Sequence, residues 1–473
     1  MKTMRYFTSL FLLILSFPFC IMGQSKSKVF TQDEFIWFVK NYHPIAVQGE
    51  LLLNKGESSI RKARGGFDPY LYTSLDQKNY DDKNYYSLLS GGLKIPTWYG
   101  IEIKTGYDQN TGEYLDPQNN VPPGGLWYAG ISVPIGQGLF IDKRRAALKQ
   151  AELYAQSTES ERQKLMNDLY FDAMKTYWYW VTAWNQYQIY EESVELAETR
   201  FEAVKQSYFL GDKPAIDTLE AFIQVQNRLM NRNEYQLEYQ NISLELSNFL
   251  WFENNTPLVI GDSLRPPAIT DIELAVSMSS DSLSSVLKRL ADLHPEMQLY
   301  QYKLASMEVE ERLKREALKP TLNLNYNAIT EPVGSNIFSG FSSQNYKWGF
   351  EFSFPIFLRS QRGDLQLTRS KIRDTELAQQ QKLLELYNKM LSYYNEQENL
   401  KAQVALFFDT VNNYDALLKG ERRKFDGGES ALFLVNSRET NLIQARVKLV
   451  ELIAKYNISN VGLIWATGTL FTI

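Results

Sequence analysis

Apolar positions follow two different periods along this chain, one helical and one strand-like. The 72 residues from Leu139 to Leu210 contain neither glycine nor proline. In their middle, apolar side chains recur every three or four positions, at Met166, Tyr170, Ala173, Tyr177, Val181 and Trp184. This spacing predicts a helix with a continuous apolar stripe, as in coiled coils and helical barrels. Such a helix would be about 100 Å long, which exceeds the thickness of a globular core.

Further helices are predicted from residue 31 to 63 and from 215 to 256. Thr31 and Glu34 have the spacing of a capping box. His43-Pro44 interrupts the first segment, and because the residue before a proline resists helical geometry, we expect a second helix to start there. A glycine ends the long helix and a proline opens the next one within Gly211-Asp212-Lys213-Pro214. This chemistry predicts a helix–turn–helix tip.

The period changes to two between residues 68 and 135, which predicts strands. Apolar and polar positions alternate from Tyr70 to Leu75, from Ile101 to Lys104 and from Trp127 to Val133. Segments rich in Asn, Asp, Gly and Pro separate them, and these are typical of loops.

A second hairpin is predicted inside this strand region. The runs Leu93-Lys94-Ile95 and Ile101-Glu102-Ile103 alternate, and the proline and glycine of 96–100 lie between them as a turn. The stretches 85–95 and 99–109 are each just long enough for a membrane strand of about 9–11 residues. We expect this hairpin to extend the sheet, although Pro96 and the paired glycines weaken it.

The pattern then repeats in the second half of the chain. Four landmarks recur in one order: His43-Pro44 with His294-Pro295, Pro69 with Pro320, Trp127 with Trp348, and Pro134 with Pro355. The offset is 251 residues at the His-Pro pairs and 221 at the Trp pairs, so the first copy carries about 30 extra residues in its strand region. We interpret this as a tandem duplication.

The predicted organisation is therefore as follows. A signal peptide covers 1–23. The first repeat covers 24–256, with a helix, strands in 68–135, a long helix over 139–210 and a helix over 215–256. A connector covers 257–285. The second repeat covers 286–473, with a helix, strands in 320–357, a long helix over 364–419 and a helix over 429–461.

The N-terminus has the features of an export signal. Lys2 and Arg5 precede an apolar run from Phe7 to Phe19, which is too short for a transmembrane helix. The only cysteine, Cys20, lies inside this signal, so we expect no disulfide in the exported chain. No later run of 18 apolar residues occurs, which leaves a periplasmic protein, a secreted protein or an outer-membrane β-barrel.

Composition and motifs give no indication of catalysis or of nucleic-acid binding. Fifty Lys and Arg against 55 Asp and Glu leave no basic stripe for a nucleic acid. The chain has no phosphate-binding loop, no G-x-S-x-G and no H-E-x-x-H. The two histidines, His43 and His294, occupy equivalent positions in the two repeats, which favours a structural role over a metal or catalytic site. We therefore expect no enzyme activity, cofactor or metal.

Strands embedded between such long helices cannot form one globular domain with them. Unpaired strand edges need closure, and one chain has too few strands for a barrel with an aqueous lumen. We therefore expect several chains to pool their hairpins in an oligomer with a β-barrel at one end and a helical barrel at the other.

With these features the sequence resembles the TolC-like outer-membrane factor (outer membrane efflux protein) family. The resemblance covers the mature chain and rests on the repeat, the glycine tips, Ser132-Val133-Pro134-Ile135 with Ser353-Phe354-Pro355-Ile356, and the C-terminal 457–459 and 466–470. It implies an α+β membrane protein, a homotrimer with an outer-membrane β-barrel joined to a periplasmic α-helical barrel. It also implies the exit duct of a tripartite efflux pump or type I secretion system, with a periplasmic adaptor protein and an inner-membrane RND or ABC transporter as partners.

The resemblance also implies site residues. At the tips it assigns adaptor contacts to Gly211, Asp212, Asp217, Gly427 and Gly428. At the barrel it assigns strand ends and an aromatic belt to Trp127, Pro134, Trp348 and Pro355, with the barrel against outer-membrane lipid. Well-known members place aspartates six and nine residues past the second-tip glycine, whereas this chain has Phe433 and Asn436 there. The pore lock and acidic cation filter of those members are therefore not expected in the same form.

Two other classes of protein fit parts of the pattern. A periplasmic or surface coiled-coil scaffold or adhesin without a pore would account for the long helices, but it needs no matched Trp-to-Pro strands in both repeats. An exported hydrolase on a helical frame would require a nucleophile, base or metal set that the chain does not offer. The strand blocks favour the duct.

Overall fold

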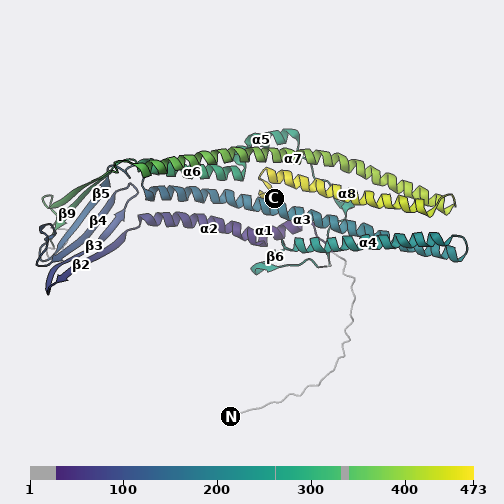
Figure 1. The fold of residues 1–473 in the computed structure, drawn as a ribbon, viewed down its shortest axis with the longest axis horizontal. Helices are drawn as coiled ribbons and strands as arrows, with labels where there is room; N and C mark the ends of the chain where they lie inside the picture. Colours follow the sequence, from purple (N-terminus) through teal and green to yellow (C-terminus); the bar gives the residue numbers. More distant parts are fainter. Residues whose placement is uncertain (1–27, 262, 332–339, 473) are drawn as a thin grey trace, which may run out of the picture.

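The structure is a computed structural model that describes residues 28–261, 263–331 and 340–472. The predicted signal peptide and Cys20 lie outside these residues. The molecule is strongly elongated, with a β-sheet at one end and the tips of two helical hairpins at the other (Figure 1). Between them run two helices of more than 65 residues, each about 100 Å long.

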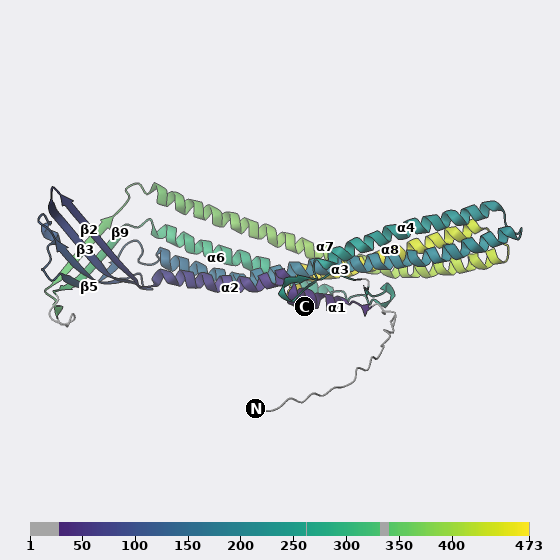
Figure 2. The same cartoon turned by 90° about the horizontal axis from the view of Figure 1, so that it is seen from below.

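Both halves of the chain present their helices in the same order. The first half has α1 (Gln32–Tyr42), α2 (Pro44–Arg64), α3 (Lys143–Phe209) and α4 (Ala215–Ser247). The second has α5 (Ser280–Leu293), α6 (Pro295–Glu316), α7 (Arg359–Asp426) and α8 (Leu432–Ala466). Both views show α3, α4, α7 and α8 side by side towards the tips, and α2, α3, α6 and α7 leading to the sheet (Figure 2).

The predicted helix boundaries in both repeats follow from side-chain caps. The Thr31 hydroxyl accepts a hydrogen bond from Glu34 N, and the Glu34 carboxylate accepts one from Thr31 N, so the capping box is confirmed. His43 Nδ1 accepts a hydrogen bond from Ile45 N, and His294 Nδ1 accepts one from Glu296 N, each at 3.2 Å. The two histidines thus cap α2 and α6, whose first residue is a proline.

Four helices differ in extent from their predicted ranges. Helix α3 begins at Lys143 rather than at 139. Helix α7 continues beyond both ends of 364–419, because Gly363 and Gly420 lie within it. An isolated glycine costs a helix only about 1 kcal/mol, so neither one ends it. Helix α4 stops at Ser247, before the short antiparallel strands β6 (Trp251–Phe252) and β7 (Thr256–Pro257). Helix α8 begins later than 429 and runs on to Ala466.

A single antiparallel sheet gathers strands from both halves. Its members are β2 (Tyr70–Tyr80), β3 (Lys83–Pro96), β4 (Glu102–Thr111), β5 (Leu126–Pro134), β9 (Thr321–Thr330) and β10 (Tyr346–Ser353). Their spatial order is β10-β9-β5-β4-β3-β2, so β10 and β2 are the two edges. The predicted extra hairpin is β3 and β4, and it extends the sheet as expected.

The main core lies at mid-length, where the two halves meet. Phe35 of α1 stacks on Tyr177 of α3 at 5.6 Å between ring centroids, and Trp180 is fully buried beside them. The connector also reaches this region, where β8 (Leu264–Arg265) pairs with β1 (Lys28–Val29). Among the described residues, no helix is both long and apolar enough to cross a membrane.

Candidate functional site

One face of the six-stranded sheet carries no charge along its regular register. Because cross-strand partners point to the same side, the pairing places uncharged side chains opposite one another from edge to edge. Its apolar and aromatic members are Leu71, Leu75, Leu89, Leu93, Ile95, Ile103, Tyr107, Trp127, Ala129, Ile131, Val133, Leu322, Leu324, Tyr326, Ala328, Tyr346, Trp348, Phe350 and Phe352. We call this the uncharged face.

The opposite face holds the charges of the paired strands. They are Asp76, Lys78, Lys94, Glu102, Lys104, Asp108, Lys347 and Glu351. Glu102 is paired with Arg144 at the start of α3, and Asp108 accepts a hydrogen bond from the Ser90 hydroxyl at 2.7 Å. We call this the charged face.

The uncharged face is open to its surroundings, although it is the more apolar of the two. The exposed fraction is 83% for Leu71 and 62% for Trp348. A contiguous apolar face on one side and charges on the other is the distribution found in strands with lipid on one side and water on the other. The strands have 8 to 14 residues, close to the length that spans a membrane.

The four predicted barrel residues lie at opposite ends of β5 and β10. Trp127 and Trp348 are on the uncharged face, near the ends of β5 and β10 that are remote from the helices. Trp127 packs against Tyr107, with ring centroids 5.1 Å apart. Pro134 ends β5, and Pro355 follows two residues after β10, both at the helix side of the sheet.

The first helical tip ends in a left-handed glycine, as the sequence indicates. Helix α3 stops at Phe209, and Gly211 has φ +83°, which a residue with a side chain rarely adopts. Asp212 N donates to Ser207 O at 2.9 Å, which caps the helix. Asp212 is exposed, and Asp217 lies half-buried in the first turn of α4.

The second tip corrects one expectation. Because Gly427 follows the second long helix as Gly211 follows the first, Gly427 is the expected left-handed residue, but its φ is −80° and the following Gly428 has φ +78°. Gly428 is therefore the structural counterpart of Gly211, and α4 and α8 each start four residues after it. Because the two glycines are adjacent, the sequence alone does not show which of them is left-handed. Counting from Gly428 reaches Leu434 and Ser437, so the acids remain absent at these positions.

The two tips lie against each other and expose apolar side chains. Lys213 Nζ lies 4.4 Å from the centre of the Phe425 ring, which connects the first tip to the second. The exposed fraction is 77% for Leu210 and 65% for Phe433, and Phe209 and Ile216 are also exposed. Apolar side chains concentrated at the end of a water-exposed hairpin are typical of a protein-binding surface.

A buried polar cluster joins the two hairpins just above the tips. Glu439 of α8 has an exposed fraction of 5% and is ion-paired with Arg200 of α3 and Arg422 of α7. The Asn436 side chain accepts from Arg200 at 2.8 Å and donates to Glu220 of α4 at 3.1 Å. This interhelical clasp contains residues of all four helices. Asn436, at a position where other members have an acid, therefore lies inside the clasp.

Sequence reasoning missed this clasp. Arg200 and Glu439 stand among other charges at helical spacing, a pattern that is common on solvated helix faces. Arg200 and Glu439 lie 239 residues apart, so no local pattern connects them. The only signal was the position of Asn436 in the tip.

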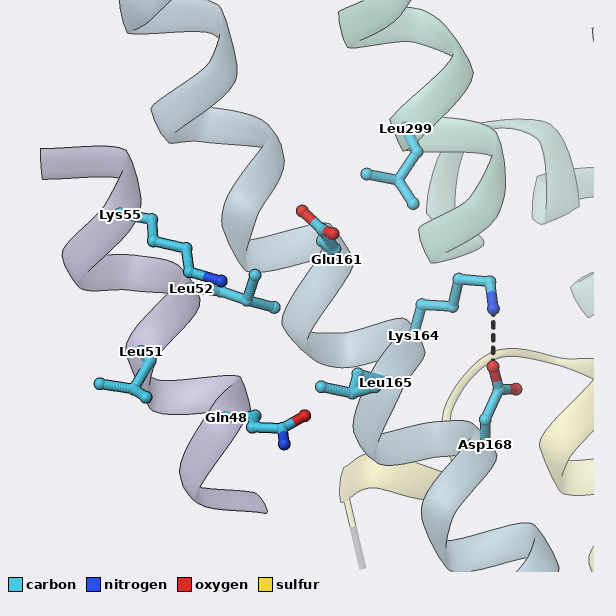
Figure 3. A pocket seen from close by; sticks show the side chains of 9 residues that line it. All are labelled: Gln48, Leu51, Leu52, Lys55, Glu161, Lys164, Leu165, Asp168 and Leu299. Atoms are coloured by element: carbon cyan, nitrogen blue, oxygen red, sulfur yellow. Dashed lines mark hydrogen bonds and ion pairs between the residues drawn. The ribbon is translucent and has the colours of Figure 1, made fainter. Parts of the chain in front are cut away.

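A furrow of about 630 Å³ lies between α2, α3 and α6 (Figure 3). Its wall is formed by leucines, Gln48, Lys55, Glu161, Lys164 and Asp168. Lys164 and Asp168 pair with each other at 2.6 Å, and Asp168 also accepts from the Trp465 indole N–H at 2.8 Å. Lys164 and Asp168 therefore neutralise each other within the furrow.

The histidines have structural roles in this geometry. Burial lowers the pKa of His43 and that of His294, the latter to about 4, so that each stays neutral and able to accept its cap hydrogen bond. Within the described residues, no group of three or more His, Cys, Asp or Glu could hold a metal ion.

Comparison with known proteins agrees with this geometry. The outer-membrane channel CmeC of Campylobacter jejuni shares the fold with a TM-score of 0.64 at 13% identity, over 93% of this chain and 85% of that one. The open-state MtrE outer-membrane channel of Neisseria gonorrhoeae has a TM-score of 0.68 at 13% identity, over 92% and 89%. The outer-membrane protein VceC of Vibrio cholerae has 0.65 at 13%, over 92% and 95%. No curated protein sequence matches the chain.

The fold is thus that of outer-membrane channels over more than nine-tenths of the chain. Residues 286–469, which make up most of the second repeat, match the model of the outer membrane efflux protein family. Over this part the chain matches the family that the sequence resembles, and the structural comparisons show the same fold over the rest. Its fold is that of outer-membrane channels such as OprN, with a TM-score of 0.68 at 12% identity over 93% of this chain and 90% of that one.

Proposed function

We propose that three copies of this chain form a passive exit duct that conducts substrates delivered by an inner-membrane transporter through a periplasmic adaptor protein. The observation that supports this most directly is the placement of two surfaces at opposite ends of the molecule. The sheet, with its uncharged face, lies at one end, and the exposed apolar tips lie at the other (Figure 1).

The two sheet edges support assembly of several copies. β2 and β10 each leave one side without a partner strand in the described chain, and such edges are unstable in lipid unless they are paired. Six strands would close into a barrel too narrow for an aqueous lumen. Three copies would supply eighteen strands, which is within the range of barrels that contain a water-filled channel.

The tips support contact with a partner protein. Leu210, Ile216 and Phe433 project from the ends of the hairpins, about 100 Å from the sheet, where lipid does not cover them. An adaptor that presents an apolar helical end would cover them. The duct itself needs no catalytic group, because energy and selectivity would come from the transporter.

The test is to measure export of a transporter substrate by cells that carry the gene and by a deletion strain as the reference. Outer-membrane fractions should contain a heat-sensitive trimer, and loss of the gene should cause a substrate of the matching transporter to accumulate. Replacement of Leu210 and Phe433 by Asp should abolish export while the trimer stays in the membrane. A monomer after crosslinking in mild detergent, or export unchanged by these tip substitutions, would overturn the proposal.

A further inference from the structure

We infer that the sheet of one chain pairs with that of the next through β2 and β10 in one defined register, with Asp76 opposite Lys347 of the next chain, in a wall of eighteen strands. This inference rests on the proposed trimer and specifies its interface. Its partner is a second copy of this chain, and its surface is the pair of free sheet edges.

All six strands have the properties of wall strands, including the extra hairpin. On β3 and β4 the uncharged face carries Leu93 and Ile103, and the charged face carries Lys94 and Lys104. If this hairpin folded outside the wall, nothing would require it to keep its charges on the same side as those of β2 and β10. The segregation continues across the whole sheet, so each chain contributes six strands.

Strand direction permits closure between identical copies. Neighbouring strands are antiparallel throughout, so the first and the last of the six run in opposite directions. The β2 edge of one chain therefore meets the β10 edge of the next as another antiparallel pair, and every strand of the ring obtains two partners.

The register of this seam follows from the stagger inside the sheet. One row of cross-strand partners on the charged face consists of Tyr70, Lys94, Lys104, Gly130, Asn327 and Lys347. For each strand we count the residues from its helix-side end to its member of the row. This count is zero for β2, two for β3 and β4, four for β5, and six for β9 and β10. The row thus moves away from the helix side as it crosses the sheet.

On the next chain the helix-side end of β2 is again Tyr70. Lys347, the member of the row on β10, lies six residues from the helix-side end of its strand. It therefore meets the residue six positions beyond Tyr70, which is Asp76. A stagger of six residues over six strands corresponds to a strand tilt of about 35° at usual strand dimensions. Membrane barrels have tilts of about 35–45°.

Side-chain chemistry selects this register among its neighbours. With Asp76 opposite Lys347 an ion pair forms on the charged face, and Leu75 comes opposite Trp348 on the uncharged one. A shift of two residues in one direction places Lys78 opposite Lys347, where like charges repel each other. A shift of two residues in the other direction places Ser74 opposite Lys347. This shift would move the row back towards the helix side, against its course across the sheet, and would lower the strand tilt to about 25°. A shift of one residue would move charges into lipid.

Disulfide trapping tests the register, because Cys20 is the only native cysteine. We would combine Asp76→Cys with Lys347→Cys, and compare Lys78→Cys with Lys347→Cys as the matched control. Directly opposed residues are close enough for a disulfide, whereas residues two further along are about 7–8 Å apart. Oxidation of outer membranes should link most chains of the first variant into dimers and trimers on non-reducing gels, and few chains of the second.

The possible results separate this inference from the proposed function. A native trimer that is trapped through Lys78 rather than Asp76, or through neither, overturns the register and leaves the duct. A monomer in every variant overturns both. In a second measurement, Asp76→Lys should lower the dissociation temperature of the trimer, and Asp76→Lys with Lys347→Asp should restore it. Failure of the exchange to restore it would contradict the pairing even if cysteines disturb the wall.

Discussion

The hydroxyl groups of Tyr72 and Tyr128 contact each other across two intervening strands on the charged face of the sheet. Between them, on β3 and β4, Gly92 and Gly106 lie directly opposite each other. A Cβ at Gly106 would lie 2.5 Å from the Tyr128 hydroxyl, and one at Gly92 would lie 3.0 Å from the Tyr72 hydroxyl. The two glycines therefore provide the space in which the tyrosines meet, and the charged face is concave at this point.

Substituting these glycines should destabilise the wall. Gly92→Val or Gly106→Val would force a branched side chain against the backbone and the tyrosines, at a cost of about 1–3 kcal/mol. We expect the dissociation temperature of the trimer, measured by heating before electrophoresis, to fall by roughly 2–10 °C. Gly349→Val on β10 is the matched control, because a Cβ there would have nothing within 4 Å. An equal fall in the control would contradict the explanation.

The left-handed glycines predict an asymmetry between neighbouring positions in the second tip. Gly428→Val should destabilise the turn by about 1–2 kcal/mol, because a residue with a side chain is strained at the φ of +78° found there. Gly427→Ala keeps an ordinary helical φ. We expect the first variant to lose export, as Gly211→Val should in the first tip, and the second to retain it. Membrane-inserted trimer must be measured alongside export, and two equally active variants would show that tip geometry is not required.

The interhelical clasp predicts a leak when Glu439 loses its charge. Glu439→Gln would leave Arg200 and Arg422 without their shared buried carboxylate, and breaking a buried ion pair from one side costs about 3–5 kcal/mol. The hairpins should separate more readily, so cells should become sensitive to large antibiotics that an intact outer membrane excludes. Glu451→Gln, which removes a partly exposed pair with Lys448 on the same helix, is the control. Unchanged sensitivity in both would argue against the clasp as a restraint on the tips.

The histidine caps predict loss of stability in acid. The pKa of His294 is lowered from about 6.5 to about 4 by burial, so the folded protein keeps the ring neutral while the unfolded chain takes up a proton. Stability from this group is complete above pH 6.5 and is lost as the pH falls towards 4, by about 2 kcal/mol at pH 5. Asp168, Lys164 and Lys382 are the charged groups that act on it.

His294→Asn separates this effect from general acid denaturation. Asparagine can also accept the cap hydrogen bond, but it does not titrate. The variant should unfold less steeply with falling pH between 6.5 and 4, as measured by thermal unfolding in detergent. A slope equal to that of the native chain would exclude His294 as the cause.

The features that could be predicted from the sequence are those encoded by neighbouring residues. The two periods identified the long helices and the strands, and the position of the two histidines before prolines identified the starts of α2 and α6. The alternation on both sides of residues 96–100 was sufficient to place β3 and β4 in the sheet.

The features that escaped prediction depend on distant contacts or on the local choice between similar residues. Gly363 and Gly420 suggested the ends of a helix that in fact runs through both, because packing against α6 and α8 outweighs the small cost of each glycine. Glu439 was not recognised as a clasp residue, since its partners come from other helices. Gly427 and Gly428 are chemically identical, so only the backbone angles distinguish them.

The inserted hairpin has an electrical consequence for a duct of this kind. A conducting pore behaves as resistors in series, and the resistance of each section falls with its cross-section. Without β3 and β4, three copies would supply twelve strands instead of eighteen. Barrel diameter grows roughly in proportion to strand number, so the hairpin would enlarge the cross-sectional area about twofold. The membrane section would then contribute a smaller share of the total resistance, and more of the voltage would drop along the helical section that ends at Gly211 and Gly428. Single-channel current would accordingly report the state of the helical section more than that of the barrel.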